Sequence, residues 1–371
     1  MKQAIFSILV VLLLATSAAI VILLARGYRL NTEDKSLDST GILVTKSEPD
    51  GAQVYVDGIF SGATNSTINL PPNWYKVRIS KQGYHDWERE MRIQGEIVVQ
   101  TDAVLFLKNP SLSALTSTGV LDPLLSPDGT KIAYIATPSA EQLSQQQATR
   151  QTEGQSIFES NLRRPTLFIY DLSGRNLPFS RNPQPYVGTL NQLLEEWELE
   201  RETSNAISLR AMPSQFQKIA TDSIRLLSFA PDGSKVLYEA TVPATLKRTI
   251  EPPLIGGLPT EEQRDLSPNM LYVYDMKDDR NYHIDFSVMY PEDENTPLPI
   301  QWIGTSRHFV LVEDGKISVM EYDGANKIPV YSGPFVNGYV FPHPVGHQLI
   351  ILTTFNPELG DLPSLYTLTI R

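Results

Sequence analysis

The first part of the chain is an uninterrupted apolar run. Residues Ala4 to Ala25 include no charged side chain, and their only polar members are Ser7, Thr16 and Ser17. A helix over this range is about 33 Å long, close to the thickness of the hydrocarbon core of a bilayer. The run therefore predicts a transmembrane anchor within residues 1–30, with the lipid bilayer as the partner of residues 4–25.

A cleaved signal peptide is the alternative for this run. The apolar core of a signal peptide is about 7 to 15 residues long and ends at a cleavage site of small residues. Here the small residues Thr16 to Ala19 are followed by the apolar stretch Ile20 to Leu24, so cleavage would leave an apolar stub. We therefore expect an uncleaved anchor. The flanking bases, Lys2 on one side and Arg26 with Arg29 on the other, do not by themselves favour a cytoplasmic N-terminus.

A small all-strand module is predicted to follow a polar tether at residues 31–40. From Trp74 to Ser80, apolar and polar side chains alternate with the period of two that a strand with one wet side requires. Residues 52–56 alternate in the same way and lead into Asp57-Gly58, a dipeptide that favours a tight hairpin turn. A third apolar run, residues 97–107, completes the module.

Residues 48–84 carry an ordered series of short motifs. These are Glu48-Pro49-Asp50-Gly51-Ala52, Val54-Tyr55-Val56-Asp57-Gly58, Gly62, Leu70, Tyr75-Lys76-Val77 and Lys81-Gln82-Gly83-Tyr84. The series resembles the PEGA domain, although Asp50 stands where the name of the family has Glu, and Ala63-Thr64-Asn65 replaces the usual Thr-Pro. The resemblance implies a small β-sandwich over residues 41–109, in a family found mostly in surface-exposed or exported prokaryotic proteins, with no catalytic residues.

Beyond residue 110 one pattern occurs twice. The segments Leu124–Ile135 and Leu227–Glu239 each contain an apolar strand, a Pro-Asp-Gly turn and a second apolar strand. Proline presets φ at the corner, aspartate bonds to its own backbone, and glycine accepts the left-handed conformation. After an insertion, each copy is followed by a third apolar strand, at residues 167–171 and 271–275. Such repetition is typical of β-propeller blades.

Two fainter copies run from Ile300 to Asp323 and from Tyr339 to Ile370. The four copies resemble the blades of TolB-like, WD-related propellers, in which a Ser-Pro-Asp-Gly turn precedes an apolar strand. The resemblance implies a propeller domain of about four blades over residues 110–371, with a degenerate fifth blade as the alternative. The predicted fold class is therefore all-β: an N-terminal single transmembrane helix, a small PEGA β-sandwich and a small β-propeller.

The chain ends on what should be the third strand of the last blade. Residues Ser111 to Thr116, which precede the first blade, are predicted to supply the missing outer strand and to hide an otherwise open edge.

Long insertions separate the second and third strands of three blades, at Pro138–Pro165, Val242–Pro268 and Asn356–Pro363. Equivalent connections of a propeller emerge on one face, so these polar, proline-rich segments should gather at one rim while adding little to the core. Two interpretations are open. The segments form a binding face, because loops on a rigid scaffold often contain the residues that bind a partner, or they are surface insertions that the fold tolerates without a function.

A separate insertion at Thr189–Arg201 has its apolar residues at the spacing of an amphipathic helix, with Thr189 and Gln192 placed for a capping box. Packing against the propeller and docking of a partner are its two interpretations.

Composition excludes some kinds of site and partner. The chain has no cysteine, which excludes metal sites built on thiolates. Its formal charge of −11 disfavours nucleic acid as a partner. The pair His343 and His347 is separated by proline and glycine and lacks the glutamate of a zincin motif. The acids Glu292 to Glu294 form a charge run in a proline-flanked loop. We therefore predict no catalytic residues, no metal site and no cofactor.

The sequence favours a non-enzymatic, single-pass membrane-anchored protein that binds or scaffolds envelope polysaccharide or protein partners. The resemblance to the PEGA domain implies a surface protein with its bulk outside the cytoplasm. The alternatives are a propeller-type glycan or peptide hydrolase or lyase at the cell surface, with acids or histidines from several blades converging on the axis, and a purely structural spacer.

Overall fold

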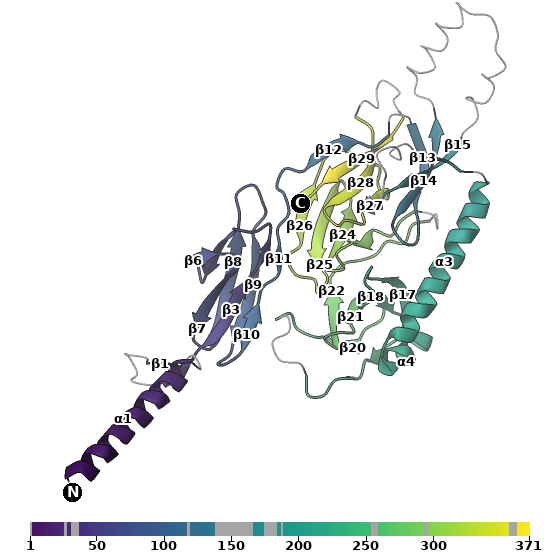
Figure 1. Ribbon diagram of the computed structural model, residues 1–371. Helices are drawn as coiled ribbons and strands as arrows, with labels where there is room; N and C mark the ends of the chain where they lie inside the picture. The colour runs from purple at the N-terminus through teal and green to yellow at the C-terminus, as the bar shows by residue number, and fades with distance from the viewer. Residues whose placement is uncertain are drawn as a thin grey trace, which may run out of the picture. The chain divides into compact units, whose positions relative to one another are not determined.

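The computed structural model describes residues 2–25, 28–30, 37–116, 119–137, 166–173, 184–186, 188–253, 259–292, 296–355 and 362–371. The chain divides into two compact units, with the main boundary between Phe106 and Leu107. Figure 1 shows the strands of both units and the helices α1, α3 and α4. The predicted domain boundaries at residues 30, 40 and 109 stay predictions.

The N-terminal segment corrects the predicted fold class and localisation. It forms the helix α1 (Lys2–Ala25), followed by the paired short strands β1 (Tyr28–Leu30) and β2 (Leu37–Ser39). Among the helices of the described residues, none is long and apolar enough to cross a membrane. This finding contradicts the transmembrane anchor over residues 1–30 and the single-pass localisation inferred from it.

The first unit contains two sheets that share one core. A four-stranded sheet has the order β6-β5-β8-β9, a three-stranded sheet has the order β10-β3-β7, and β4 pairs with β11. The strands are β3 (Gly41–Thr45), β4 (Ser47–Glu48), β5 (Gln53–Val56), β6 (Ile59–Ala63), β7 (Ser66–Leu70), β8 (Asn73–Ser80), β9 (Trp87–Ile93), β10 (Val98–Gln100) and β11 (Ala103–Val104). Leu43, Val54, Val77 and Met91 are buried in the shared core, as the predicted sandwich requires.

The second unit contains four sheets of four strands each among its described residues. Blade 1 consists of β13 (Gly119–Leu125), β14 (Lys131–Thr137), β15 (Thr166–Asp171) and β16 (Gln184–Pro185). Blade 2 consists of β17 (Ile224–Phe229), β18 (Lys235–Ala240), β21 (Leu271–Asp275) and β22 (Arg280–Ile284). Blade 3 consists of β23 (Ile300–Trp302), β24 (His308–Glu313), β25 (Lys316–Glu321) and β26 (Ile328–Tyr331).

Blade 4 consists of β27 (Val340–Pro342), β28 (Gln348–Thr353), β29 (Ser364–Thr369) and, from the start of the unit, β12 (Ser111–Ala114). The strand β12 pairs antiparallel with β29, with Ser111 opposite Thr369 and Ala114 opposite Tyr366. The prediction that residues 111–116 complete the last blade is therefore confirmed.

All four blades repeat the same backbone hydrogen bonds at the turn between their first two strands. In each blade, the N–H of the residue that begins the turn donates to the carbonyl of the first residue of the second strand. The pairs are Ser126–Lys131, Ala230–Lys235, Ile303–His308 and His343–Gln348, with N···O distances of 2.8–3.1 Å. The residue after the third strand donates to the residue before the second strand in the pairs Leu172–Thr130, Met276–Ser234, Tyr322–Arg307 and Ile370–His347. The two fainter copies in the sequence are therefore blades of the same kind as the two clear ones.

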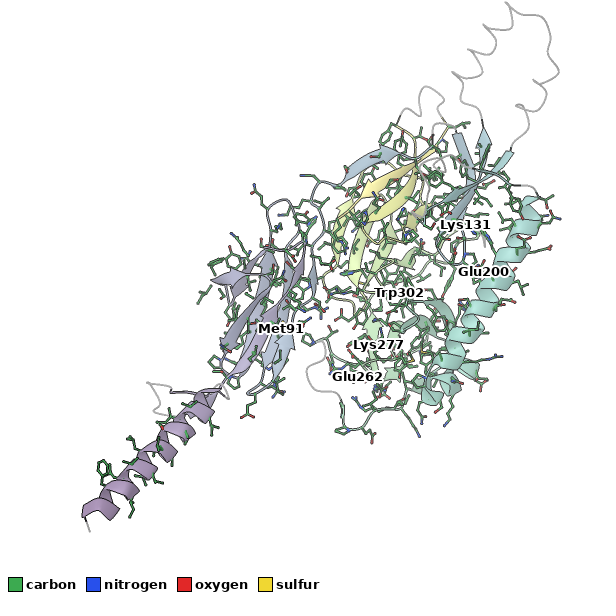
Figure 2. The ribbon with its side chains drawn as sticks, in the orientation of Figure 1. Met91, Lys131, Glu200, Glu262, Lys277 and Trp302 are labelled. Atoms are coloured by element: carbon green, nitrogen blue, oxygen red, sulfur yellow. The ribbon has the colours of Figure 1, made fainter. Side chains whose placement is uncertain are left out.

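Neighbouring blades share apolar cores. One cluster joins blades 2 and 3 through Leu237, Val273, Trp302 and Phe309, and another joins blades 4 and 1. The indole N–H of Trp302 also donates to the carbonyl of Ser228 in the adjacent blade, at 3.4 Å. Figure 2 labels Trp302 within this part of the structure.

Two helices pack against blade 2. The helix α3 (Leu190–Ala211) begins with the predicted capping box, in which the Thr189 hydroxyl accepts from the N–H of Gln192 and the Gln192 side chain accepts from the N–H of Thr189. The helix α4 (Ser214–Asp222) places Phe216 against Tyr274, with ring centroids 5.1 Å apart and an interplanar angle of 10°. The contacts with blade 2 thus come from α4 and from Leu209 near the end of α3, both beyond the predicted range. Within Thr189–Arg201, Leu193 is buried, and the choice between packing and docking of a partner stays open there.

Candidate functional site

The insertion Val242–Pro268, described except for residues 254–258, contributes apolar side chains to the core of blade 2. Its short strands β19 (Ala244–Thr245) and β20 (Asp265–Leu266) pair with one another, and Leu246 and Leu266 are buried with the apolar residues of the blade. The prediction that this segment adds little to the core is therefore wrong. The insertion at 138–165 and residues 356–361 of the third insertion lie outside the described residues.

A buried aspartate fastens this insertion to the turn between β21 and β22. One carboxylate oxygen of Asp279 accepts the N–H groups of Thr249 and Ile250, each at 2.7 Å. The other oxygen accepts the hydroxyl of Tyr274 at 3.0 Å and lies 3.2 Å from the guanidinium of Arg264. Burial alone would raise the pKa of Asp279, but the two N–H groups, the hydroxyl and the guanidinium together lower it.

The same insertion covers the outer strand of blade 2. Gln263 donates its N–H to the carbonyl of Asn281 at 2.8 Å, and the Asn281 side chain donates to the carbonyl of Gln263 at 2.6 Å. Glu262, labelled in Figure 2, pairs with both Arg264 and Arg248. These groups satisfy one another, so the cluster holds the loop on the edge of β22 and is a structural network.

The histidine pair and the acidic run, for which the sequence predicts no metal site, are placed as follows. His343 opens the turn of blade 4, where its Nδ1 accepts the N–H of Val345 at 3.3 Å. Burial lowers the pKa of His343, and the neighbouring His347 lowers it further. In the part of the chain that the structure describes, no group of three or more His, Asp or Glu side chains is placed to hold a metal ion. Two of the three acids of the run at 292–294 lie outside the described residues.

The outer side of the sheet β6-β5-β8-β9 in the first unit has a different character. Successive strand residues point to opposite sides of a sheet, and here Val54, Val77, Ile79 and Met91 face the core. We call the other side the open face. It carries Gln53, Tyr55, Phe60, Trp74, Lys76, Arg78, Ser80, Glu88, Glu90 and Arg92.

One row of the open face crosses all four strands. Phe60 pairs with Tyr55, Tyr55 with Arg78, and Arg78 with Glu88. The rings of Phe60 and Tyr55 meet edge to face at 5.8 Å, and the guanidinium carbon of Arg78 lies 4.2 Å from the centroid of the Tyr55 ring. Such edge-to-face and cation–π contacts hold the rings in a defined orientation.

Two aromatic side chains of the open face project into solvent. Phe60 is 59% exposed and Trp74 is 53% exposed. Trp74 lies two rows away from Phe60, opposite Arg92 on β9. A sheet with one wet side normally carries polar residues there, so the two exposed rings are the departure that marks this face.

Polar side chains of the open face and its rim are held in place by one another. Asp86 accepts from the guanidinium of Arg78 at 3.1 Å and from the hydroxyl of Ser80 at 2.6 Å. The hydroxyl of Tyr55 donates to the amide oxygen of Gln53 at 2.9 Å. The open face therefore presents flat apolar rings beside hydrogen-bonding groups of fixed position.

The sequence pattern contained a signal for this face that the inward-facing alternation obscured. The strand Trp74–Ser80 is predicted from its alternating apolar residues, which face the core. Its outward positions are polar except for Trp74, which is aromatic. Phe60 is the second residue after the turn and pairs with Tyr55, and the bulge on β6 comes only after it. The two-residue turn at Asp57-Gly58 therefore places Phe60 on the same side of the sheet as Tyr55.

Comparison with protein families bears on the first unit. Residues 40–109 match the PEGA domain family. The open face is therefore one side of the PEGA domain, and the resemblance found in the sequence is confirmed for this region. No curated protein matches the chain.

Solved structures show weak likenesses. A protein assigned as TolB in Agrobacterium tumefaciens is 9% identical, with 85% of this chain and 79% of that chain covered and a TM-score of 0.21. TolB from Acinetobacter baumannii is 13% identical, with 89% and 54% covered and a TM-score of 0.18. The oligogalacturonate lyase of Vibrio parahaemolyticus is 9% identical, with 92% of each chain covered and a TM-score of 0.23. With TM-scores this low, these likenesses carry no argument, and the assignment of blades rests on the sheet topology of the chain itself.

Proposed function

We propose that this protein is a non-catalytic binding or scaffolding module for a polysaccharide or protein partner, and that the open face of the PEGA domain is its contact surface. The observation that carries the proposal is the exposure of Phe60 and Trp74 on a face that otherwise carries mostly polar side chains, several of them bonded to one another. Exposed aromatic side chains with fixed polar neighbours are typical of binding surfaces, because they bury large apolar area at small entropic cost.

The second unit supports this role as a scaffold. Two ion pairs of buried or nearly buried side chains, Asp279 with Arg264 and Lys235 with Asp275, lie in blade 2 and its insertion. The ammonium of Lys235 also lies 4.7 Å from the ring centroid of Tyr322. Groups engaged in this way stabilise a blade and its junction with the next one.

A capture experiment tests the proposal. The full chain is immobilised and exposed to an extract of its source cells, and captured protein and captured polysaccharide are measured separately. We expect the double variant Phe60→Ala/Trp74→Ala to lose most of the captured material. A matched control, Leu199→Ala/Ile207→Ala, removes apolar side chains that are 65% and 63% exposed on α3 and should capture as much as the wild type. Equal capture by the wild type and the open-face variant would refute the proposal.

A further inference from the structure

We propose that the ligand of the open face is an uncharged polysaccharide strand; this inference rests on the proposed function and names the ligand class of the same surface. A pyranose ring has a flat face of C–H groups and an edge of hydroxyls. The C–H face packs on an aromatic ring, and the hydroxyls form hydrogen bonds with planar polar side chains. Phe60, Tyr55 and Trp74 supply the rings on the open face. The polar side chains around Arg78 and Lys76 supply the hydrogen-bonding groups.

The polar groups are oriented before a ligand arrives. Asp86 is fixed by Arg78 and Ser80 at 3.1 and 2.6 Å, and the carboxylate of Glu88 is paired with the ammonium of Lys76 at 2.5 Å. Because these side chains lose little freedom on binding, the entropic cost of association is reduced.

The spacing of the rings selects a polymer. On β8, Trp74 is four residues from Arg78, which stands in the same row as Phe60. Four strand residues correspond to about 14 Å along the strand, and the two strand steps from β8 to β6 correspond to about 10 Å across the sheet. A single sugar does not reach both rings, whereas a strand of several sugars lying diagonally across the face does.

The charges of the open face favour an uncharged strand. The face and its rim carry three bases, Lys76, Arg78 and Arg92, and three acids, Asp86, Glu88 and Glu90. The opposite charges offset one another locally, and the whole chain carries −11. A polyanion such as a polyuronate or a nucleic acid therefore gains no net attraction from this surface, and a polyhydroxyl chain without charge meets no repulsion.

The test is affinity electrophoresis of the full chain in gels that contain one polymer each: a mixed-linkage β-glucan, a xylan, a mannan or a galactan, with a polyuronate as the charged comparison. We expect retardation by at least one of the four uncharged polymers and not by the polyuronate. Phe60→Ala and Trp74→Ala should each raise the dissociation constant about tenfold, which corresponds to about 1.4 kcal/mol. Phe60→Tyr and Trp74→Phe should stay within about twofold of the wild type, because each keeps a flat ring.

Leu199→Ala/Ile207→Ala is the control for an unspecific loss of apolar surface, and unchanged thermal unfolding of each variant shows that it folds. If none of the four uncharged polymers retards the chain, the inference is overturned. In that case, capture of a protein partner that depends on Phe60 and Trp74 would leave the proposed function intact. Retardation that the alanine variants do not weaken would also overturn the inference, because the strand would then bind elsewhere.

Discussion

The N–H of Asp232 donates a hydrogen bond of 3.0 Å to the side-chain oxygen of Ser306, 74 residues later in the chain. Asp232 lies in the turn between the first two strands of blade 2, and Ser306 lies in the equivalent turn of blade 3. Ser306 has a φ of 59° where the other three turns have Gly129, Gly233 and Gly346. The serine therefore adopts a backbone conformation that favours glycine, and its side chain joins two blades.

Replacing Ser306 should separate these two effects. Ser306→Ala removes the acceptor of a part-buried N–H and should reduce the free energy of unfolding by about 1–3 kcal/mol. Ser306→Gly loses the same bond but relieves the positive φ, so it should be about 1 kcal/mol more stable than Ser306→Ala. Chemical denaturation measures both. The control is Gly233→Ala, where a Cβ would meet nothing within 4 Å, so that its cost reports the backbone penalty alone. Equal stability of wild type and Ser306→Ala would show that the bond does not hold the blades together.

The carboxyl group of Asp232 should make the propeller sensitive to acid. Partial burial alone would raise its pKa, but the hydroxyl and N–H of Ser234 and the ammonium of Lys277 lower the pKa to about 2. A carboxyl whose pKa is lower in the folded state stabilises the fold above its ordinary pKa of about 4, and this stability is lost as the pH falls towards 2. The effect should be small, because the side chain is 41% exposed.

Thermal unfolding from pH 5 to pH 2 tests this prediction. Asp232→Asn should lose less stability than the wild type over that range, and Lys277→Met should shift the loss to higher pH. Parallel curves for wild type and Asp232→Asn would contradict the assignment.

The insertion at residues 242–268 should be required for the stability of blade 2. Arg264→Gln leaves Asp279 without its guanidinium partner in a site where Asp279 is 2% exposed, so it should cost about 3–5 kcal/mol. The matched control Arg201→Gln breaks an ion pair whose side chains are 60% and 64% exposed and should change stability by less than about 0.5 kcal/mol. Equilibrium unfolding measures the difference. Similar costs for the two variants would mean that the insertion is only surface decoration.

The strand β12 should control whether the propeller unfolds cooperatively. Deleting residues 111–116 removes the partner of β29 and exposes its edge, so the truncated chain should aggregate or unfold without a single transition. Thr116→Val is the milder variant, because it removes only the hydroxyl that accepts the N–H of Leu365 at 3.0 Å, and it should cost about 1–3 kcal/mol. A single cooperative unfolding transition after the deletion, as in the undeleted chain, would show that another segment completes the blade.

Local signals account for the parts of the fold that the sequence predicts. The Pro-Asp-Gly turns, the hairpin at Asp57-Gly58 and the capping box at Thr189 each lie within a few residues, and each appears in the structure. The missing strand of blade 4 was predictable because a blade with three strands leaves an edge that some other segment must cover.

Features that depend on distant contacts could not be predicted in this way. Val242–Pro268 has the composition of a loose loop, and its burial follows from Asp279 and Asn281, which lie on a different element. The turn at Ser306 lacks glycine, so its equivalence to the other turns appears only in its φ and its hydrogen bonds. The open face requires the register of four strands, which brings Phe60, Tyr55 and Arg78 into one row.

Hydroxyl-radical footprinting of the full chain, with and without its captured partner, tests the central claim most directly. The oxidation rates of Phe60 and Trp74, which are 59% and 53% exposed in the unbound chain, should fall at least about fivefold on binding, because a bound partner excludes solvent from both rings. Leu199 and Ile207 on α3 should oxidise at unchanged rates. Unchanged oxidation of Phe60 and Trp74, together with protection confined to the blades of the second unit, would contradict the account.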